Sequence, residues 1–181
     1  MKYNIIYADP AWKYNDKPNK KGRTVESHYP TMDIEDIKAL PISELADDNC
    51  VLFIWVTFPK LQEGLDTIKA WGFTYKTIAF NWVKRNKVAD TWFWGMGKWT
   101  RANSEICLLA TKGTPKRMSA SVLDNPISIH SRKPNEARKR IIELCGDLPR
   151  VELFAREQLE GFDVWGNQVE NSLTLGGEEK N

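Results

Sequence analysis

An uninterrupted apolar stretch, Cys50-Val51-Leu52-Phe53-Ile54-Trp55-Val56, lies near the end of the first third of the chain. A strand covered on both faces needs apolar side chains on both, whereas a strand with one wet face alternates. The stretch therefore predicts a central strand of a sheet with helices on either side. Apolar runs at 3–8, 74–83, 104–111 and 151–154 predict four more strands.

Helical patterns alternate with these runs. One helix is expected to begin at Asp33 as N-cap, a second carries an apolar stripe from Leu61 to Trp71, and a third begins at Pro134 and ends at Gly146. Strands alternating with helices predict an α/β sandwich with a mostly parallel sheet. We expect one domain over residues 1–170 and a flexible tail over 171–181, which is rich in Gly and Glu.

Composition excludes several classes of protein. In 181 residues, 41% are hydrophobic and 28% are charged, which is enough apolar material for a core and too much for global disorder. No apolar run approaches the roughly 18 residues of a membrane span. Three cysteines without a C-x-x-C pair predict reduced thiols in a cytoplasmic protein, and two histidines leave no expected metal site.

Basic residues cluster in the loops, although the formal net charge is only +2. A basic rim around one face would suit a polyanion, so we predict that Lys84, Lys98 and Arg101 contact nucleic acid. The alternative is that each cluster is a solvated surface. The tryptophans of the segment 91–99 also allow two interpretations: they stack on bases, or they hold the loop against the core.

The first predicted strand ends in Asp9-Pro10-Ala11-Trp12. In a parallel sheet, ligands collect at the carboxyl ends of strands. The Asp9 carboxylate and the Pro10 carbonyl can accept hydrogen bonds from one amino group, while the Trp12 indole stacks on the attached ring. This arrangement would suit the exocyclic N6 of adenine. For Asp-Pro alone, an incidental turn at a strand end would be the better interpretation.

Further motifs follow in a consistent order over residues 3–169. They are Tyr7-Ala8-Asp9-Pro10-Ala11-Trp12, His28-Tyr29-Pro30-Thr31-Met32, Leu52-Phe53-Ile54-Trp55-Val56-Thr57, Asn81-Trp82-Val83-Lys84, Gly95-Met96-Gly97-Lys98-Trp99, Glu105-Ile106-Cys107-Leu108, His130-Ser131-Arg132-Lys133-Pro134, Glu152-Leu153-Phe154-Ala155-Arg156 and Trp165-Gly166-Asn167-Gln168. In this series the chain resembles the MT-A-type N6-adenine methyltransferases, which transfer a methyl group from S-adenosylmethionine to adenine in DNA or RNA.

The resemblance implies a Rossmann-like methyltransferase sandwich with a circularly permuted motif order. It implies that Asp9 and Pro10 bind the target amino group, that Trp12 stacks on the base, and that Tyr29 belongs to the active-site loop. The positions that it assigns to the donor site are Asp9, Lys133, Glu152, Phe154, Arg156, Asn167 and Gln168.

Two departures from the family pattern stand out. The usual motif is Asp-Pro-Pro-Trp, whereas the third residue here is Ala11. We expect the protein to be active with this residue, and the loop to be less rigid than with proline. Only eight residues precede Asp9, whereas family members often have an N-terminal segment that contributes to the donor pocket; we expect either that other loops supply these contacts or that donor binding is weaker.

The substrate prediction is DNA, because the compact chain looks like the small bacterial or phage members. Alternatives are an RNA N6-adenosine methyltransferase, a catalytically silent nucleic-acid-binding subunit, and an enzyme for a small amine. No sequence feature marks an interface for a homo-oligomer or a partner subunit.

Overall fold

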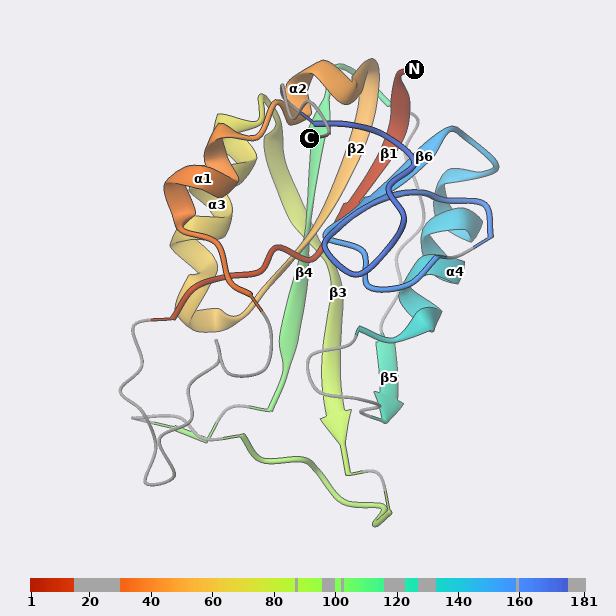
Figure 1. The fold of residues 1–181 in the computed structure, drawn as a ribbon. Helices are drawn as coiled ribbons and strands as arrows, with labels where there is room; N and C mark the ends of the chain where they lie inside the picture. The colour runs from red at the N-terminus through yellow and green to blue at the C-terminus, as the bar shows by residue number, and fades with distance from the viewer. Residues whose placement is uncertain are drawn as a thin grey trace.

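The computed structural model describes residues 1–14, 30–86, 88–95, 100–101, 103–115, 123–126, 133–158 and 160–175. Within these residues the strands form a seven-stranded sheet in the order β5-β3-β4-β2-β1-β6-β7 (Figure 1). The strands are β1 (Tyr3–Ala8), β2 (Ala46–Val56), β3 (Thr74–Arg85), β4 (Glu105–Lys112), β5 (Leu123–Pro126), β6 (Arg150–Leu153) and β7 (Asp163–Trp165).

The sheet is mostly parallel, as predicted. β1 pairs in parallel with β2 and β6, β6 with β7, and β3 with β5. β4 is antiparallel to both of its neighbours, β2 and β3. β1 therefore comes first in the chain while its neighbour β6 comes near the end, which is the permuted order that the family resemblance implies.

Helices cover both faces of the sheet (Figure 1). On one face lie α1 (Ile34–Ala39), α2 (Ile42–Leu45), the 3₁₀ turn η2 (Phe58–Lys60) and α3 (Leu61–Ala70); on the other lies α4 (Asn135–Cys145). The central strand β2 supplies alternate residues to two separate cores. Leu52 and Ile54 pack with Ile37 and Ile68 of the helices on the first face, whereas Phe53 packs in the core on the α4 side. This arrangement explains why the stretch 50–56 is apolar throughout.

Some boundaries differ from the sequence expectations. The short elements β5, β7 and α2 were not predicted, because three or four residues carry too little periodicity to be recognised. Asp33 precedes α1, but its side chain makes no capping bond and instead accepts from Lys13 at 2.9 Å. Within the predicted tail, Leu175 is buried and the Ser172 amide donates to the Val164 carbonyl; residues 176–181 lie outside the described part.

No helix among the described residues has the length and apolarity to cross a membrane.

Candidate active site

The candidate site lies where β1, β6 and β7 end. Because these strands are parallel, their carboxyl ends meet at one edge of the sheet. Two narrow cavities of about 40 and 20 Å³ open there, and Asp9, Phe154 and Arg156 line both. A larger hollow of about 570 Å³ lies at the amino ends of β6 and β7, against Arg150 and Phe162, and contains none of the predicted site residues.

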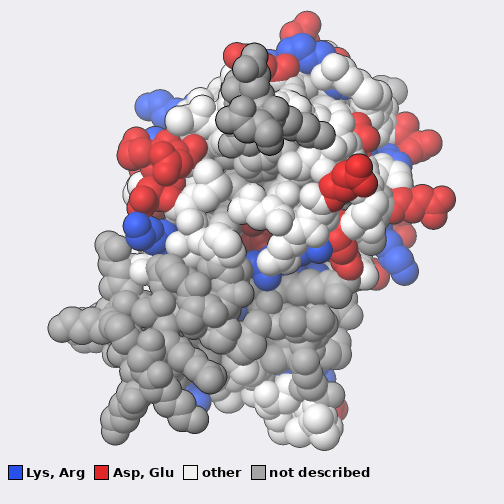
Figure 2. Space-filling view, viewed as in Figure 1, with Lys and Arg blue, Asp and Glu red and all other residues white. Residues whose placement is uncertain are grey.

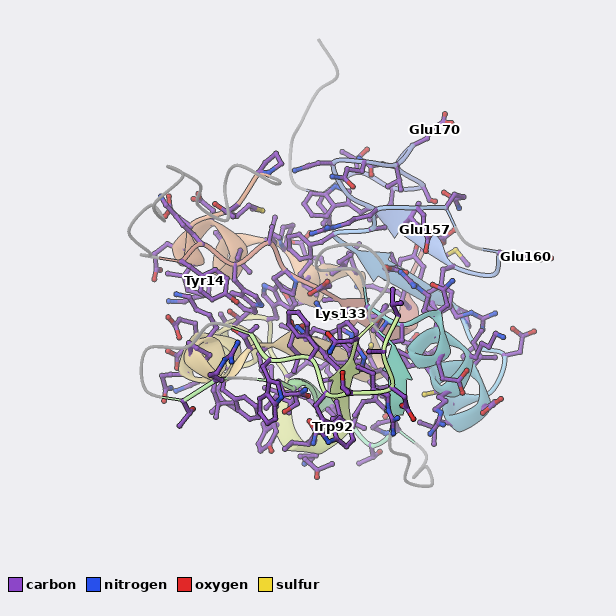
Figure 3. All side chains as sticks on the ribbon, turned by 90° about the horizontal axis from the view of Figure 1, so that it is seen from below. Tyr14, Trp92, Lys133, Glu157, Glu160 and Glu170 are labelled. Atoms are coloured by element: carbon purple, nitrogen blue, oxygen red, sulfur yellow. The ribbon has the colours of Figure 1, made fainter. Side chains whose placement is uncertain are left out.

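A chain of alternating charges runs through the site from β3 to β1. The Lys133 ammonium donates to both carboxylate oxygens of Asp9 at 2.8 Å. The same ammonium lies 3.1 Å from Oε2 of Glu105, and Lys84 donates to Oε1 of that carboxylate. Lys133, near the centre of Figure 3, is almost fully buried, whereas the Asp9 side chain is 22% exposed. The network is therefore buried at its centre and partly exposed at both ends, where the Asp9 side chain is 22% exposed and the Lys84 side chain 18%.

Burial and neighbouring charges determine the ionisation of this network. Burial raises the pKa of Asp9, and the Lys133 ammonium opposes that rise. Burial would also raise the pKa of Glu105, but the ammonium groups of Lys133 and Lys84 outweigh it and hold the pKa below its usual value. Burial opposes the charge on Lys133, yet the Asp9 and Glu105 carboxylates raise its pKa. Lys133 thus stays charged at every physiological pH, and Asp9 is the group closest to taking up a proton.

Aromatic rings form the wall behind these charges. The Lys133 ammonium lies 5.5 Å from the centre of the Trp55 ring, and the Trp55 indole N–H donates to the Tyr7 hydroxyl at 2.8 Å. Lys84 lies 5.1 Å from the Trp82 ring. Both tryptophans are buried, so each ring makes a cation–π contact with its lysine ammonium from within the core.

A second buried ion pair lies beside the smaller cavity. Arg138 of α4 donates from Nε and Nη2 to the two oxygens of Glu152 at 2.7 and 2.6 Å. Its Nη1 donates to Asn135 at 2.9 Å. Burial raises the pKa of Glu152, which the Arg138 guanidinium opposes. The bidentate geometry fixes the orientation of the carboxylate at the end of β6.

The turn after β6 has an unusual backbone. Phe154 has a φ of 62°, a left-handed conformation that costs a non-glycine residue of order 1–3 kcal/mol and is typical of functional sites. Its ring packs edge-to-face on Trp165 at 5.5 Å. Ala155 donates to the Trp165 carbonyl, and a Cβ on Gly166 would lie 2.2 Å from the Ala155 carbonyl oxygen. Glycine at 166 therefore lets the turns after β6 and β7 approach closely along the larger cavity.

A comparison with protein families matches residues 3–168 to the family described as MT-A70. The chain belongs to the MT-A70 family. The chain is 31% identical to the Type II methyltransferase M.MunI from a Mycoplasma species, over 93% of this chain and 78% of that protein. The identity is 29% to the N(6)-adenosine-methyltransferase MT-A70-like protein of Drosophila melanogaster and 28% to the human N(6)-adenosine-methyltransferase catalytic subunit METTL3. In both cases the match covers 97% of this chain but only 26% and 28% of the longer animal protein.

Family membership confirms the resemblance inferred from the motifs and, together with the sheet, the Rossmann-like α/β class. The structure also brings together all seven residues that the MT-A70 motifs assign to the donor site. They line one or both of the two cavities: Asp9, Lys133, Glu152, Phe154, Arg156, Asn167 and Gln168. What these residues bind stays a prediction.

Trp12 and Pro10 lie differently from the expectation. Trp12 is only 5% exposed, packs in the core on the α1 and α3 side, and donates its indole N–H to the Trp55 carbonyl at 3.0 Å. The Pro10 carbonyl accepts the backbone amide of Trp12 at 2.8 Å, which leaves one of its two lone pairs for a ligand. Trp12 also lines a cavity of about 190 Å³ with Met32 and Lys60, but so little of the residue is exposed that stacking on a base would require it to move.

The predicted nucleic-acid contacts are spread out. Lys84 belongs to the buried charge chain, whereas Arg101 is exposed and donates to the Trp94 carbonyl at 3.5 Å. Tyr29 and Lys98 lie outside the described residues.

Sequence reasoning missed Glu105 and Arg138. Each is a charged residue within an apolar pattern, at the start of β4 and on the buried face of α4, and that mismatch is the signal that could have found them. Glu152, which the resemblance places in the donor site, is buried against Arg138.

Proposed function

We propose that the protein is an S-adenosylmethionine-dependent methyltransferase that modifies N6 of adenine in DNA, in the cytoplasm. The observation that carries the proposal is the position of Asp9. This carboxylate lies at the carboxyl end of β1, is partly exposed, and is the member of the ionic network that lines both adjoining cavities. A methyl transfer needs the acceptor nitrogen in line with the donor's methyl group, so the sites for the two reactants must adjoin, as the two cavities do at Asp9.

The lining of the two cavities fits the chemistry of the donor. Carboxylates at Asp9 and Glu152 suit cationic and hydroxyl groups, and the Arg156 side chain suits a carboxylate. The three N–H donors of Lys133, in contrast, are directed at Asp9 and Glu105. Phe154, with the amides of Asn167 and Gln168, suits a purine. When bound, S-adenosylmethionine supplies an electrophilic methyl group on a positively charged sulfur. The cavities are smaller than such a donor, so we expect the turns after β6 and β7 to separate when it binds.

Asp9 would orient the acceptor amine. Each carboxylate oxygen has two lone pairs, so Asp9 can keep its bonds to Lys133 and accept an N–H of the substrate as well. The Pro10 carbonyl, with one lone pair taken by the Trp12 amide, can accept the second N–H. Two accepted hydrogen bonds favour a tetrahedral nitrogen whose lone pair points away from Asp9. Orientation of this kind supplies much of the rate, and Asp9 need not remove the proton.

The choice of DNA rests on the similarity to M.MunI, whose name denotes a Type II methyltransferase and most of whose length this chain covers. The animal relatives are named for N(6)-adenosine, and this chain covers only about a quarter of their length. Cys50 and Cys107 are buried free thiols, which supports a reducing compartment.

The test is methyl transfer from labelled S-adenosylmethionine to duplex DNA, single-stranded DNA and RNA, each digested to nucleosides and separated by mass. The proposal predicts N6-methyldeoxyadenosine from DNA. Label in N6-methyladenosine alone would make the substrate RNA. Donor binding without any labelled nucleoside would contradict the proposal and favour a silent subunit.

A further inference from the structure

Two exposed tryptophans lie at the end of β3, apart from the cavities. Trp92 is 47% exposed and Trp94 is 52% exposed, whereas Phe93 between them is partly covered. This alternation places the two indoles on the same side of an extended segment. Large exposed aromatic side chains that lie together are typical of an interaction surface rather than of a loop held on the core.

The segment that presents them is well fixed. The Asn103 side chain bonds the amide and the carbonyl of Lys84 at 2.9 Å and also donates to the Phe93 carbonyl. Asn86 donates to Thr91 at 2.8 Å, and its backbone amide donates to the Thr91 carbonyl at 3.0 Å. The tryptophans are therefore held on an ordered backbone, which lowers the entropy that a partner must overcome on binding.

One arginine lies beside each tryptophan. The Arg85 guanidinium lies 4.9 Å from the centre of the Trp92 ring, and Arg101 lies beside the Trp94 carbonyl. The stretch 84–103 contains five basic residues and one acidic residue, a net charge of +4 in a chain whose total is +2. On the face shown in Figure 2, acidic and basic side chains are mixed over the upper part of the molecule.

The charge chain links this surface to the candidate active site. Lys84 precedes Arg85 in β3 and bonds Glu105, which pairs with Lys133 and thereby reaches Asp9. Figure 3, which looks at this end of the sheet, shows Trp92 on one side of Lys133.

We propose that Trp92 and Trp94, with Arg85 and Arg101, form a stacking platform for unpaired bases next to the target adenine. Aromatic rings stack on any base, and arginines beside them neutralise the backbone phosphates. A second copy of this chain is a poorer occupant, because a symmetric contact would place the +4 segment against itself. The platform deepens the proposed function, and its substrate class is a polynucleotide with unstacked bases beside the reacting one.

The test is fluorescence anisotropy with a labelled single-stranded DNA that contains one adenine, and with the same DNA carrying abasic sites on both sides of that adenine. The variant is Trp92→Leu/Trp94→Leu, which keeps apolar side chains but removes the rings. The matched control is Tyr75→Leu, an exposed aromatic residue at the opposite end of β3. Urea unfolding midpoints check that all three chains fold.

We expect the double variant to bind the intact DNA about tenfold or more weakly than the wild type, within the range for loss of base stacking. It should bind the abasic DNA as the wild type does, and Tyr75→Leu should change neither affinity. Equal affinity of the double variant and the wild type for intact DNA would overturn the platform, as would an equal loss on both DNAs. A wild-type dimer that becomes a monomer in the double variant, measured by sedimentation, would overturn it in favour of a self-interface.

Methyl transfer by the wild type is measured in parallel. Ring-dependent binding without transfer would contradict the proposed function and leave the platform standing. Transfer with no dependence on the rings would contradict the platform alone.

Discussion

The ends of β1, β6 and β7 differ from the end of β3 in the kind of side chains that they carry. At the ends of β1, β6 and β7, charged groups are buried and paired: Lys133 with Asp9, and Arg138 with Glu152. At the end of β3, tryptophans are exposed and arginines lie at the surface. A reacting amine has to be oriented within tenths of an ångström, which requires side chains held by buried contacts. A polynucleotide can be bound by exposed rings and charges without such precision. We infer that the first region carries the chemistry and the second carries recognition.

This contrast predicts that stability responds strongly in the first region. Replacing Arg138 by Met should lower the free energy of unfolding by about 3–5 kcal/mol, because Glu152 would be left buried without its partner. Urea unfolding measures the change. The control is Arg140→Met on the same helix, which breaks a partly exposed pair with Glu136 and should cost less, about 1 kcal/mol or below.

A double replacement separates stability from donor binding at this pair. Arg138→Met/Glu152→Met should recover most of the stability, since no buried charge remains unpaired. It should still bind S-adenosylmethionine more weakly in calorimetry, because the oriented carboxylate is gone. Full recovery of donor affinity would show that Glu152 has a structural role only.

Loss of Lys133 should lower the free energy of unfolding less than loss of Arg138 does, and it should also shift the pH profile of kcat/KM. Lys133→Met should cost about 2–3 kcal/mol, because Asp9 is partly exposed and Glu105 keeps Lys84. The ammonium lowers the pKa of Asp9, so its removal raises that pKa further. Asp9 must be ionised to accept the amine, and the acid limb of kcat/KM should therefore move to higher pH. A limb that stays in place would show that another group controls it.

Glu105→Gln should move the acid limb of the pH profile of kcat/KM in the opposite direction, to lower pH. The Glu105 carboxylate raises the pKa of Asp9 and also shares Lys133 with it. Without that charge, Lys133 interacts more strongly with Asp9, whose pKa falls. The acid limb should shift to lower pH, with about a tenfold loss of kcat or less because Glu105 does not line the cavities. A shift to higher pH would contradict the proposed order of charges.

The smallest change is expected in the β3 region. Asp90→Ala removes an ion pair with Arg85 in which the aspartate side chain is 88% exposed. Its effect on unfolding should lie within about 1 kcal/mol, as for other exposed ion pairs. Affinity for nucleic acid should rise slightly, since a negative charge beside Arg85 is removed. A stability loss comparable to that of Arg138→Met would erase the contrast between the two regions.

Much of this arrangement could be predicted from the sequence, and the reasons are local. The apolar run 50–56 predicted the central strand, and Asp9 with the later motifs predicted which residues would meet at the strand ends. Glu105 and Arg138 could not be placed, because their roles depend on partners 28 and 14 residues away that only the folded chain brings near. The burial of Trp12 was missed for a related reason: its bond to the Trp55 carbonyl joins two strand ends that are 43 residues apart.

The most direct measurement is the yield of N6-methyldeoxyadenosine made by Asp9→Asn, set beside its affinity for S-adenosylmethionine. Asparagine keeps the size of the side chain but loses the charge and one acceptor. We predict that nucleoside mass spectrometry detects no methylated product while calorimetry still detects donor binding. Wild-type yield from this variant would contradict the account, because no carboxylate would then be needed to hold the amine.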